Sequence, residues 1–159
     1  MGRTVRMRRG PHGQVTGVTD ALGRTTRRGW TIEGMPAWRE GPDGGREEWQ
    51  WDTEGNLVLH TDEAGHTTTY TYTHYDQPAT RTDPDGAHYA FAYDTELRLI
   101  RVTNPQGKEW HYTYDAAGHL VAETDFDGAT RTYERTGPDA ALRSRRGRAH
   151  DRPARRVHR

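Results

Sequence analysis

The sequence lacks cysteine and has little apolar material. Only 31% of its 159 residues are hydrophobic, and its mean hydropathy is −1.14. The absence of cysteine excludes disulfides and thiolate metal sites. No apolar run is long enough for a membrane span, and the basic start of the chain is not followed by the apolar run of an export signal. We therefore expect a thin fold in which aromatic residues, 9% of the chain, supply much of the packing.

The charged residues are unevenly distributed, although the formal net charge is zero. Residues 135–159 contain nine Arg and two Asp, whereas residues 20–134 contain ten basic and twenty-one acidic residues. Residues 135–159 also lack aromatic residues, so we predict that they form a disordered tail. Clustered arginine can bind nucleic acid. A nonfunctional end, such as a reading-frame error in a GC-rich gene would produce, explains the composition better, so nucleic acid is not an expected partner.

The most informative feature that is present is a period of 21 residues. Glycine recurs at this spacing at Gly23, Gly44, Gly65, Gly86, Gly107 and Gly128. Aromatic residues fill two further columns, Trp30, Trp51, Tyr72, Tyr93 and Tyr114, and Trp49, Tyr70, Phe91, Tyr112 and Tyr133. These two columns hold ten of the fifteen aromatic residues, which chance does not explain. The period therefore indicates a repeat protein in which each repeat is one supersecondary unit.

Turn motifs divide each period into two strands. In "DPDG" at 83–86 and "NPQG" at 104–107, Pro stands second and Gly fourth, as in a type I turn followed by a left-handed residue. Motifs such as "DAAG" at 115–118 repeat this logic half a period away. The predicted turn residues are Asp62, Gly65, Asp83, Gly86, Asn104, Gly107, Asp115, Gly118, Asp125 and Gly128.

The segments between the turns have the alternation of β-strands. "EWHYTY" at 109–114 alternates aromatic and polar residues, which places the aromatic side chains on one face. We predict an all-β fold, an antiparallel meander of about a dozen strands in which 21-residue β-hairpin repeats form an open, twisted strip. Equivalent aromatic residues of neighbouring repeats should stack as a ladder, formed by Trp49, Trp51, Tyr70, Tyr72, Phe91, Tyr93, Tyr112 and Tyr114.

Residues for catalysis or metal binding are not arranged as those chemistries require. A calcium loop of the EF-hand kind needs oxygen ligands at alternate positions over a dozen residues, whereas here glycine follows three residues after the first acid and no third acid continues the series. His60, His66 and His74 have spacings that change face along a strand. The one serine, Ser144, lies in the arginine-rich tail. We expect no enzyme activity, no cofactor and no metal site.

The unit Tyr-Asp-x-x-Gly-x-Leu-x-x-x-x-Asp-x-x-Gly resembles the YD repeat of Rhs proteins, of the C components of bacterial insecticidal toxin complexes and of teneurins. It is complete in "YDAAGHLVAETDFDG" from Tyr114 and nearly complete in "WDTEGNLVLHTDEAG" from Trp51. The resemblance covers residues 13–134, about six repeats, and residues 1–12 form a basic segment that could be a truncated repeat.

The resemblance implies a structural function. In Rhs-like proteins, many YD repeats wind a β-strip into a hollow shell around a C-terminal effector, usually a toxin, and intact relatives are exported or lie at the cell surface. Six repeats are too few to close such a shell, so the resemblance implies a truncated piece of shell whose partners are the remaining repeats and the toxin cargo. Because exposed aromatic faces can also stack on sugars, a carbohydrate- or protein-binding module is the alternative.

Overall fold

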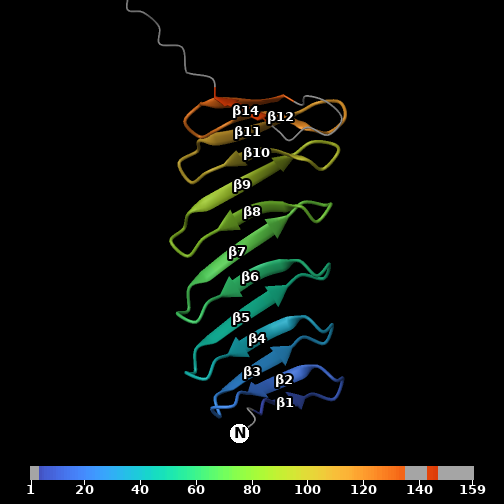
Figure 1. The fold of residues 1–159 in the computed structure, drawn as a ribbon, viewed down its shortest axis with the longest axis vertical. Helices are drawn as coiled ribbons and strands as arrows, with labels where there is room; N and C mark the ends of the chain where they lie inside the picture. The colour runs from blue at the N-terminus through green and yellow to red at the C-terminus, as the bar shows by residue number, and fades with distance from the viewer. Residues whose placement is uncertain (1–3, 135–142, 147–159) are drawn as a thin grey trace, which may run out of the picture. The chain divides into compact units, whose positions relative to one another are not determined.

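The structure, a computed structural model, describes residues 4–134 and 143–146. All regular structure in these residues is β, with fourteen strands and no helix (Figure 1). The described part of the chain accordingly holds no helix that could cross a membrane. The predicted all-β class is confirmed.

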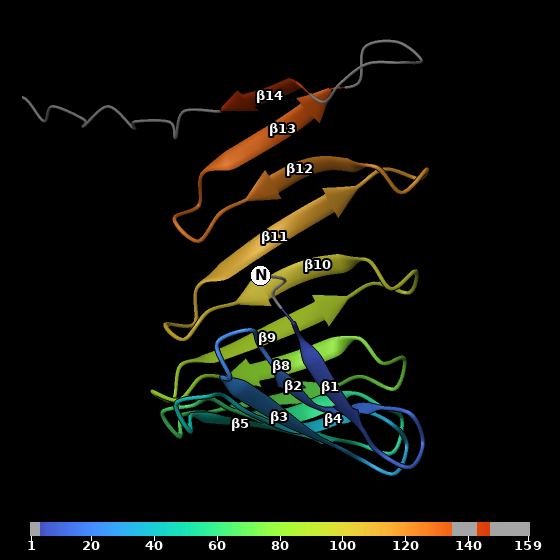
Figure 2. The same ribbon diagram turned by 60° about the horizontal axis from the view of Figure 1, so that its bottom comes forward.

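The chain divides into two compact units, residues 1–88 and 89–159. In the first unit, consecutive strands pair antiparallel in chain order. These strands are β1 (Arg6–Arg9), β2 (Val15–Thr19), β3 (Thr25–Trp30), β4 (Pro36–Glu40), β5 (Arg46–Trp51), β6 (Leu57–Thr61), β7 (Thr67–Tyr72) and β8 (Pro78–Thr82). Figure 2 shows β1 lying across the direction of β8, so the sheet of this unit is twisted.

The second unit repeats the same meander. Its strands are β9 (His88–Tyr93), which begins with the last residue of the first unit, β10 (Leu99–Thr103), β11 (Glu109–Tyr114), β12 (Leu120–Thr124), β13 (Thr130–Glu134) and β14 (Arg143–Arg146). Each pairs antiparallel with the next. The predicted hairpin repeats are therefore confirmed in both units.

Two kinds of hairpin alternate along the chain. The β6–β7 hairpin has a regular register, in which His60 pairs with Thr68. In the β5–β6 hairpin, Trp51 pairs with Leu57 but Gln50 pairs with Leu59, so Val58 is an extra residue that forms a β-bulge. The same shift recurs in β1–β2, β3–β4, β7–β8, β9–β10 and β11–β12. Since side chains alternate along a strand, the bulge places Leu57 on the same face as Trp51.

Both rows of turns have the same backbone geometry. In the turn after β5, the Gly55 N–H donates to the Asp52 carbonyl (3.2 Å), and the Asp52 N–H donates to the Asn56 carbonyl (2.9 Å). Gly55 has a φ of 89°, in the left-handed region where glycine is favoured. Two residues with side chains occupy the equivalent position in other repeats, Asp76 (φ 57°) and Leu97 (φ 60°).

The packing is one-sided. No hydrophobic side chain among the described residues is fully buried. Along β5, the exposed side chains of Glu48 and Gln50 alternate with the half-buried side chains of Trp49 and Trp51. The sheet thus has an aromatic face, which carries the rings of the ladder, and a polar face, which carries residues such as Gln50.

The ends of the chain form strands at their described positions. Arg6–Arg9 of the basic N-terminal segment form β1 and pair with β2. The sequence interpretation placed Arg143–Arg146 in a disordered tail, but the structure pairs their backbone with β13 as strand β14. The other residues of that segment, 135–142 and 147–159, lie outside the described residues, as do residues 1–3.

Candidate functional site

The aromatic face is the surface on which the predicted ladder residues lie. In the first unit these are Trp49, Trp51, Tyr70 and Tyr72, and in the second unit Phe91, Tyr93, Tyr112 and Tyr114, all of them half-buried. Within the second unit, Trp110 stacks on Tyr112 with ring centroids 6.2 Å apart. In the first unit, His60 stacks on Trp49 at 5.6 Å. Histidine therefore takes part in the packing of this face.

One column of the ladder also satisfies backbone groups. The Trp51 indole donates to the Pro36 carbonyl (2.7 Å), and the Tyr72 hydroxyl donates to the Leu57 carbonyl (2.8 Å). Trp30 and Tyr114 make the equivalent bonds to carbonyls fifteen residues earlier. Leu57 is the first residue of β6 and lies beyond the last backbone pair between β6 and β7, so the ring replaces a ladder hydrogen bond where the strands diverge.

This hydrogen-bonding role was not recognised in the sequence, although a signal was present. Every member of this column is Trp or Tyr, which carry a ring donor, whereas the other column contains Phe91. Burial raises the pKa of the Tyr72 hydroxyl above its ordinary value of 10.0. The hydroxyl therefore remains a donor at neutral pH.

The predicted turn acids bind backbone N–H groups. Asp62 Oδ1 accepts from Ala64 N–H (2.9 Å) and His66 N–H (2.8 Å). The same pair of bonds, from the residues two and four positions later, is accepted by Asp20, Asp52, Asp94, Asn104, Asp115 and Asp125. At 83–86 the arrangement differs, because Asp83 accepts from Arg81 Nε (2.7 Å) and Asp85 accepts the Ala87 N–H (2.9 Å).

These bonds lower the pKa of the turn carboxylates. Backbone hydrogen bonds hold the pKa of Asp52, Asp62, Asp94 and Asp115 below the ordinary value of 3.8. For Asp20 the largest cause of the lowered pKa is the side-chain hydrogen bond from Arg24. The carboxylates are thus ionised at neutral pH, and their oxygens are engaged within the turn.

The glycines of both turn rows complete this geometry. Gly65, Gly86, Gly107, Gly118 and Gly128 all have φ between 75° and 83°. Side chains also connect turns of successive repeats within each unit. Asn56 Nδ2 donates to Asp76 Oδ1 (2.9 Å), and Lys108 Nζ forms an ion pair with Asp127 Oδ1 (2.8 Å). Within residues 4–134 and 143–146, no group of three or more His, Asp or Glu side chains is placed to hold a metal ion.

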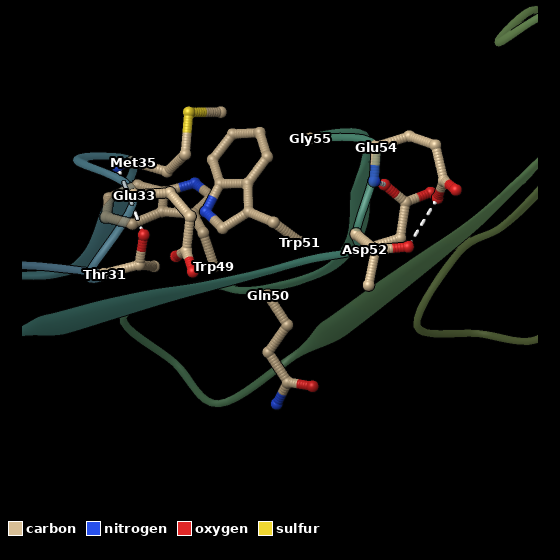
Figure 3. A pocket seen from close by; sticks show the side chains of 10 residues that line it. Thr31, Glu33, Met35, Trp49, Gln50, Trp51, Asp52, Glu54 and Gly55 are labelled. Carbon is tan, nitrogen blue, oxygen red and sulfur yellow. Dashed lines mark hydrogen bonds between the residues drawn. The ribbon is translucent and has the colours of Figure 1, made fainter.

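A groove of about 860 Å³ adjoins the ladder in the first unit (Figure 3). It is lined by Thr31, Glu33, Met35, Trp49, Trp51, Asp52 and Glu54, among others. Figure 3 shows Trp49, Trp51, Met35 and Glu33 on one side of β5, with the Gln50 side chain on the other. Indole rings and carboxylates therefore meet in one hollow, which suits a planar or cationic group.

Comparison with known families accounts for the period. The sequence profile described as RHS Repeat matches residues 51–88 and 93–130. The chain belongs to the RHS repeat family. The matched residues of this RHS repeat chain include all ten predicted turn residues and six of the eight predicted ladder residues, because Trp49 and Phe91 lie outside the matched ranges. No curated protein sequence matches the chain.

Solved structures share the fold of the RHS repeat chain. A crystal structure of TcdB2-TccC3 aligns with a TM-score of 0.68 at 15% identity, over 82% of this chain and 9% of that chain. For TcdB2-TccC3-Cdc42 the values are 0.67, 16%, 84% and 9%. A Photorhabdus luminescens Tc holotoxin pore aligns at 0.66 and 15%, over 83% of this chain and 8% of that chain. The RHS repeat chain thus spans less than a tenth of these chains, and the likeness shows the fold alone.

Proposed function

We propose that the RHS repeat chain is a non-catalytic segment of a β-shell that encloses a toxin effector. Its partners in this proposal are further repeats of the same kind and the enclosed effector. The observation that carries the proposal is that the recurring side chains bind the backbone of the repeats themselves. Ring donors such as Trp51 link each bulged hairpin to the preceding one, and turn acids such as Asp62 accept hydrogen bonds from the N–H groups of their own turn.

The one-sided packing supports this role. Within the described residues β1 pairs only with β2, so its other edge is free to accept a further strand. The rings of the aromatic face are half-buried, which leaves apolar area for another layer or an enclosed protein to cover. Additional repeats would satisfy both requirements, as in other repeat proteins, where each unit stabilises its neighbour.

The comparisons support the same role. The matched structures are named as Tc toxin assemblies that contain TccC3, and this chain aligns with a small part of them. The family membership and the shared fold make a wall-forming role the simplest function for a chain whose recurring geometry is the hairpin itself.

The proposal can be tested by lengthening the chain. Tandem copies of residues 51–134 would be added before Met1, and a protease-sensitive protein would be fused after Arg159. We expect hollow particles by electron microscopy and a trypsin-resistant passenger, whereas the unlengthened chain carrying the same passenger should leave it cleavable. Extended filaments with a cleaved passenger would refute enclosure.

A further inference from the structure

The groove of Figure 3 has a counterpart in the second unit that the chain fills with its own side chain. There the Arg98 guanidinium lies 5.0 Å from the centroid of the Tyr114 ring. Arg98 also forms ion pairs with Asp94, at 2.7 Å, and with Glu96. The guanidinium is thus stacked on an aromatic ring and neutralised by two turn carboxylates.

The 21-residue period identifies the matching positions in the first unit. Three periods before Glu96, Arg98 and Tyr114 stand Glu33, Met35 and Trp51. Glu33 keeps the carboxylate of Glu96, whereas Thr31 stands at the position of Asp94. The aromatic ring is kept as Trp51, and Trp is a better cation–π partner than Tyr. At the position of Arg98 stands Met35, which has no charge. The positions of this column hold Gln14, Met35, Asn56, Gln77, Arg98 and His119, so only the repeat of Arg98 supplies its own guanidinium. The hollow around Met35 offers a ring and a carboxylate without one.

The charges of the groove are not balanced by the surrounding residues. Glu33 is exposed and forms no ion pair within the described part of the chain. Residues 31–66 contain nine acidic residues and two arginines. Both arginines are already paired, Arg39 with Glu47 at 3.0 Å and Arg46 with Glu48 at 2.7 Å. An added guanidinium would meet an attractive potential here.

We propose that this groove binds the guanidinium group of an arginine side chain from a partner polypeptide. The planar group stacks on the Trp51 indole and donates to the Glu33 carboxylate, as Arg98 does with Tyr114 and Glu96. Lysine fits less well, because its ammonium cannot stack and offers no planar pair of donors. The inference is independent of the proposed shell function, since it rests on the groove, on its unpaired carboxylate and on the comparison with Arg98.

The test uses the full chain and a short blocked peptide, acetyl-Gly-Arg-Gly-amide. Its citrulline analogue, which keeps the shape and removes the charge, is the matched control. The Trp51 indole N–H resonance, assigned from the Trp51→Phe variant, should shift saturably with the arginine peptide. The citrulline peptide should bind at least about tenfold more weakly, and the lysine peptide should lie between the two.

Two substitutions exchange the residues at the equivalent positions 35 and 98. Met35→Arg supplies the missing guanidinium and should abolish peptide binding, whereas Met35→Leu should bind as the wild type does. In the opposite direction, Arg98→Met should open an equivalent groove beside Tyr114 and raise the stoichiometry from one peptide to two. Glu33→Gln should weaken binding about tenfold, in line with the loss of one charged partner.

Several results would overturn the proposal. Equal binding of the arginine and citrulline peptides would show that the groove does not recognise the guanidinium group. Binding that survives Met35→Arg would show that the peptide does not bind in this groove. A saturable shift with neutral oligosaccharides and none with the arginine peptide would assign the groove to carbohydrate. By contrast, self-association of the wild type that Met35→Arg abolishes would support the proposal, with the arginine-rich segment of a second copy as the partner.

Discussion

The aromatic face and the turns stabilise the same repeats through different constraints. On the aromatic face, equivalent positions hold Trp, Tyr or Phe, because burial of ring area requires a class of side chain. In the turns of the described residues, ten of the twelve left-handed positions are glycine, because a backbone angle requires one residue type. We therefore expect the loss in the free energy of unfolding to follow the ring area removed on the aromatic face and the φ angle of the substituted residue in the turns.

The largest change in the free energy of unfolding is expected for a substitution on the aromatic face. Trp51→Ala removes a half-buried indole and its bond to the Pro36 carbonyl, and should lower the free energy of unfolding by about 2–3 kcal/mol. The neighbouring Gln50→Ala on the polar face should change it by less than about 0.5 kcal/mol. Urea denaturation of both variants measures the contrast, and equal losses would contradict one-sided packing.

In the turns, Gly107→Ala isolates the backbone constraint. Gly107 has a φ of 75°, and a Cβ there would meet nothing within 4 Å, so only the left-handed conformation is penalised. We expect a loss of about 1–2 kcal/mol in the free energy of unfolding. Gln106→Ala in the same turn is the control and should be nearly neutral. A neutral Gly107→Ala would mean that glycine is not required by conformation.

A smaller effect separates hydrogen bonding from ring area on the aromatic face. Tyr72→Phe keeps the ring and removes the hydroxyl that donates to Leu57, which should cost about 1 kcal/mol. Tyr70 makes no hydroxyl hydrogen bond within the described residues, so Tyr70→Phe should be close to neutral. Thermal unfolding of the two variants would show whether the columns differ as the structure indicates.

The two exceptions in the turns should respond in the opposite direction. Leu97 adopts a φ of 60°, so Leu97→Gly should relieve backbone strain and raise the free energy of unfolding by about 0.5–1 kcal/mol. Asp76→Gly should gain less, because Asp76 accepts a hydrogen bond from Asn56. A loss of stability in Leu97→Gly would show that its side chain contributes more than its conformation costs.

The smallest effect per residue is expected from acid, because the turn carboxylates are solvent-exposed. Folding lowers the pKa of Asp52 below 3.8, so its stabilising contribution is present above pH 3.8 and is lost as pH falls through the lowered folded-state value. Asp62, Asp94 and Asp115 should behave alike. Asp52→Asn keeps the acceptor oxygen, as Asn104 does, and should lose its share of this dependence when urea midpoints are compared from pH 5 downwards.

Much of the fold could be predicted from sequence because the period repeats the same turn chemistry. The residue types of Asp62 and Gly65 alone predict a reversal of the chain, and the same holds for the equivalent residues of the other repeats. The β-bulge at Val58 could not be predicted, because its positions hold residues as different as Thr16 and Ile100 and the bulge is defined by pairing across strands.

The groove required both kinds of information. The equivalence of Met35 and Arg98, three periods apart, is visible in the aligned repeats. Its meaning depends on the contact between Arg98 and Tyr114, which joins residues from two strands and a turn. The sequence shows that Met35 and Arg98 are equivalent positions, and only the structure shows the guanidinium–ring contact that Met35 cannot make.

The recurring bulge constrains how such a gene can change length. One codon inserted within a strand would exchange the faces of the side chains up to the next reversal, exposing rings and burying charges. Duplication of 21 consecutive codons, wherever it begins, returns every residue to its original side. Growth or shrinkage of these arrays is therefore expected in whole steps, with smaller insertions confined to the tips of the loops.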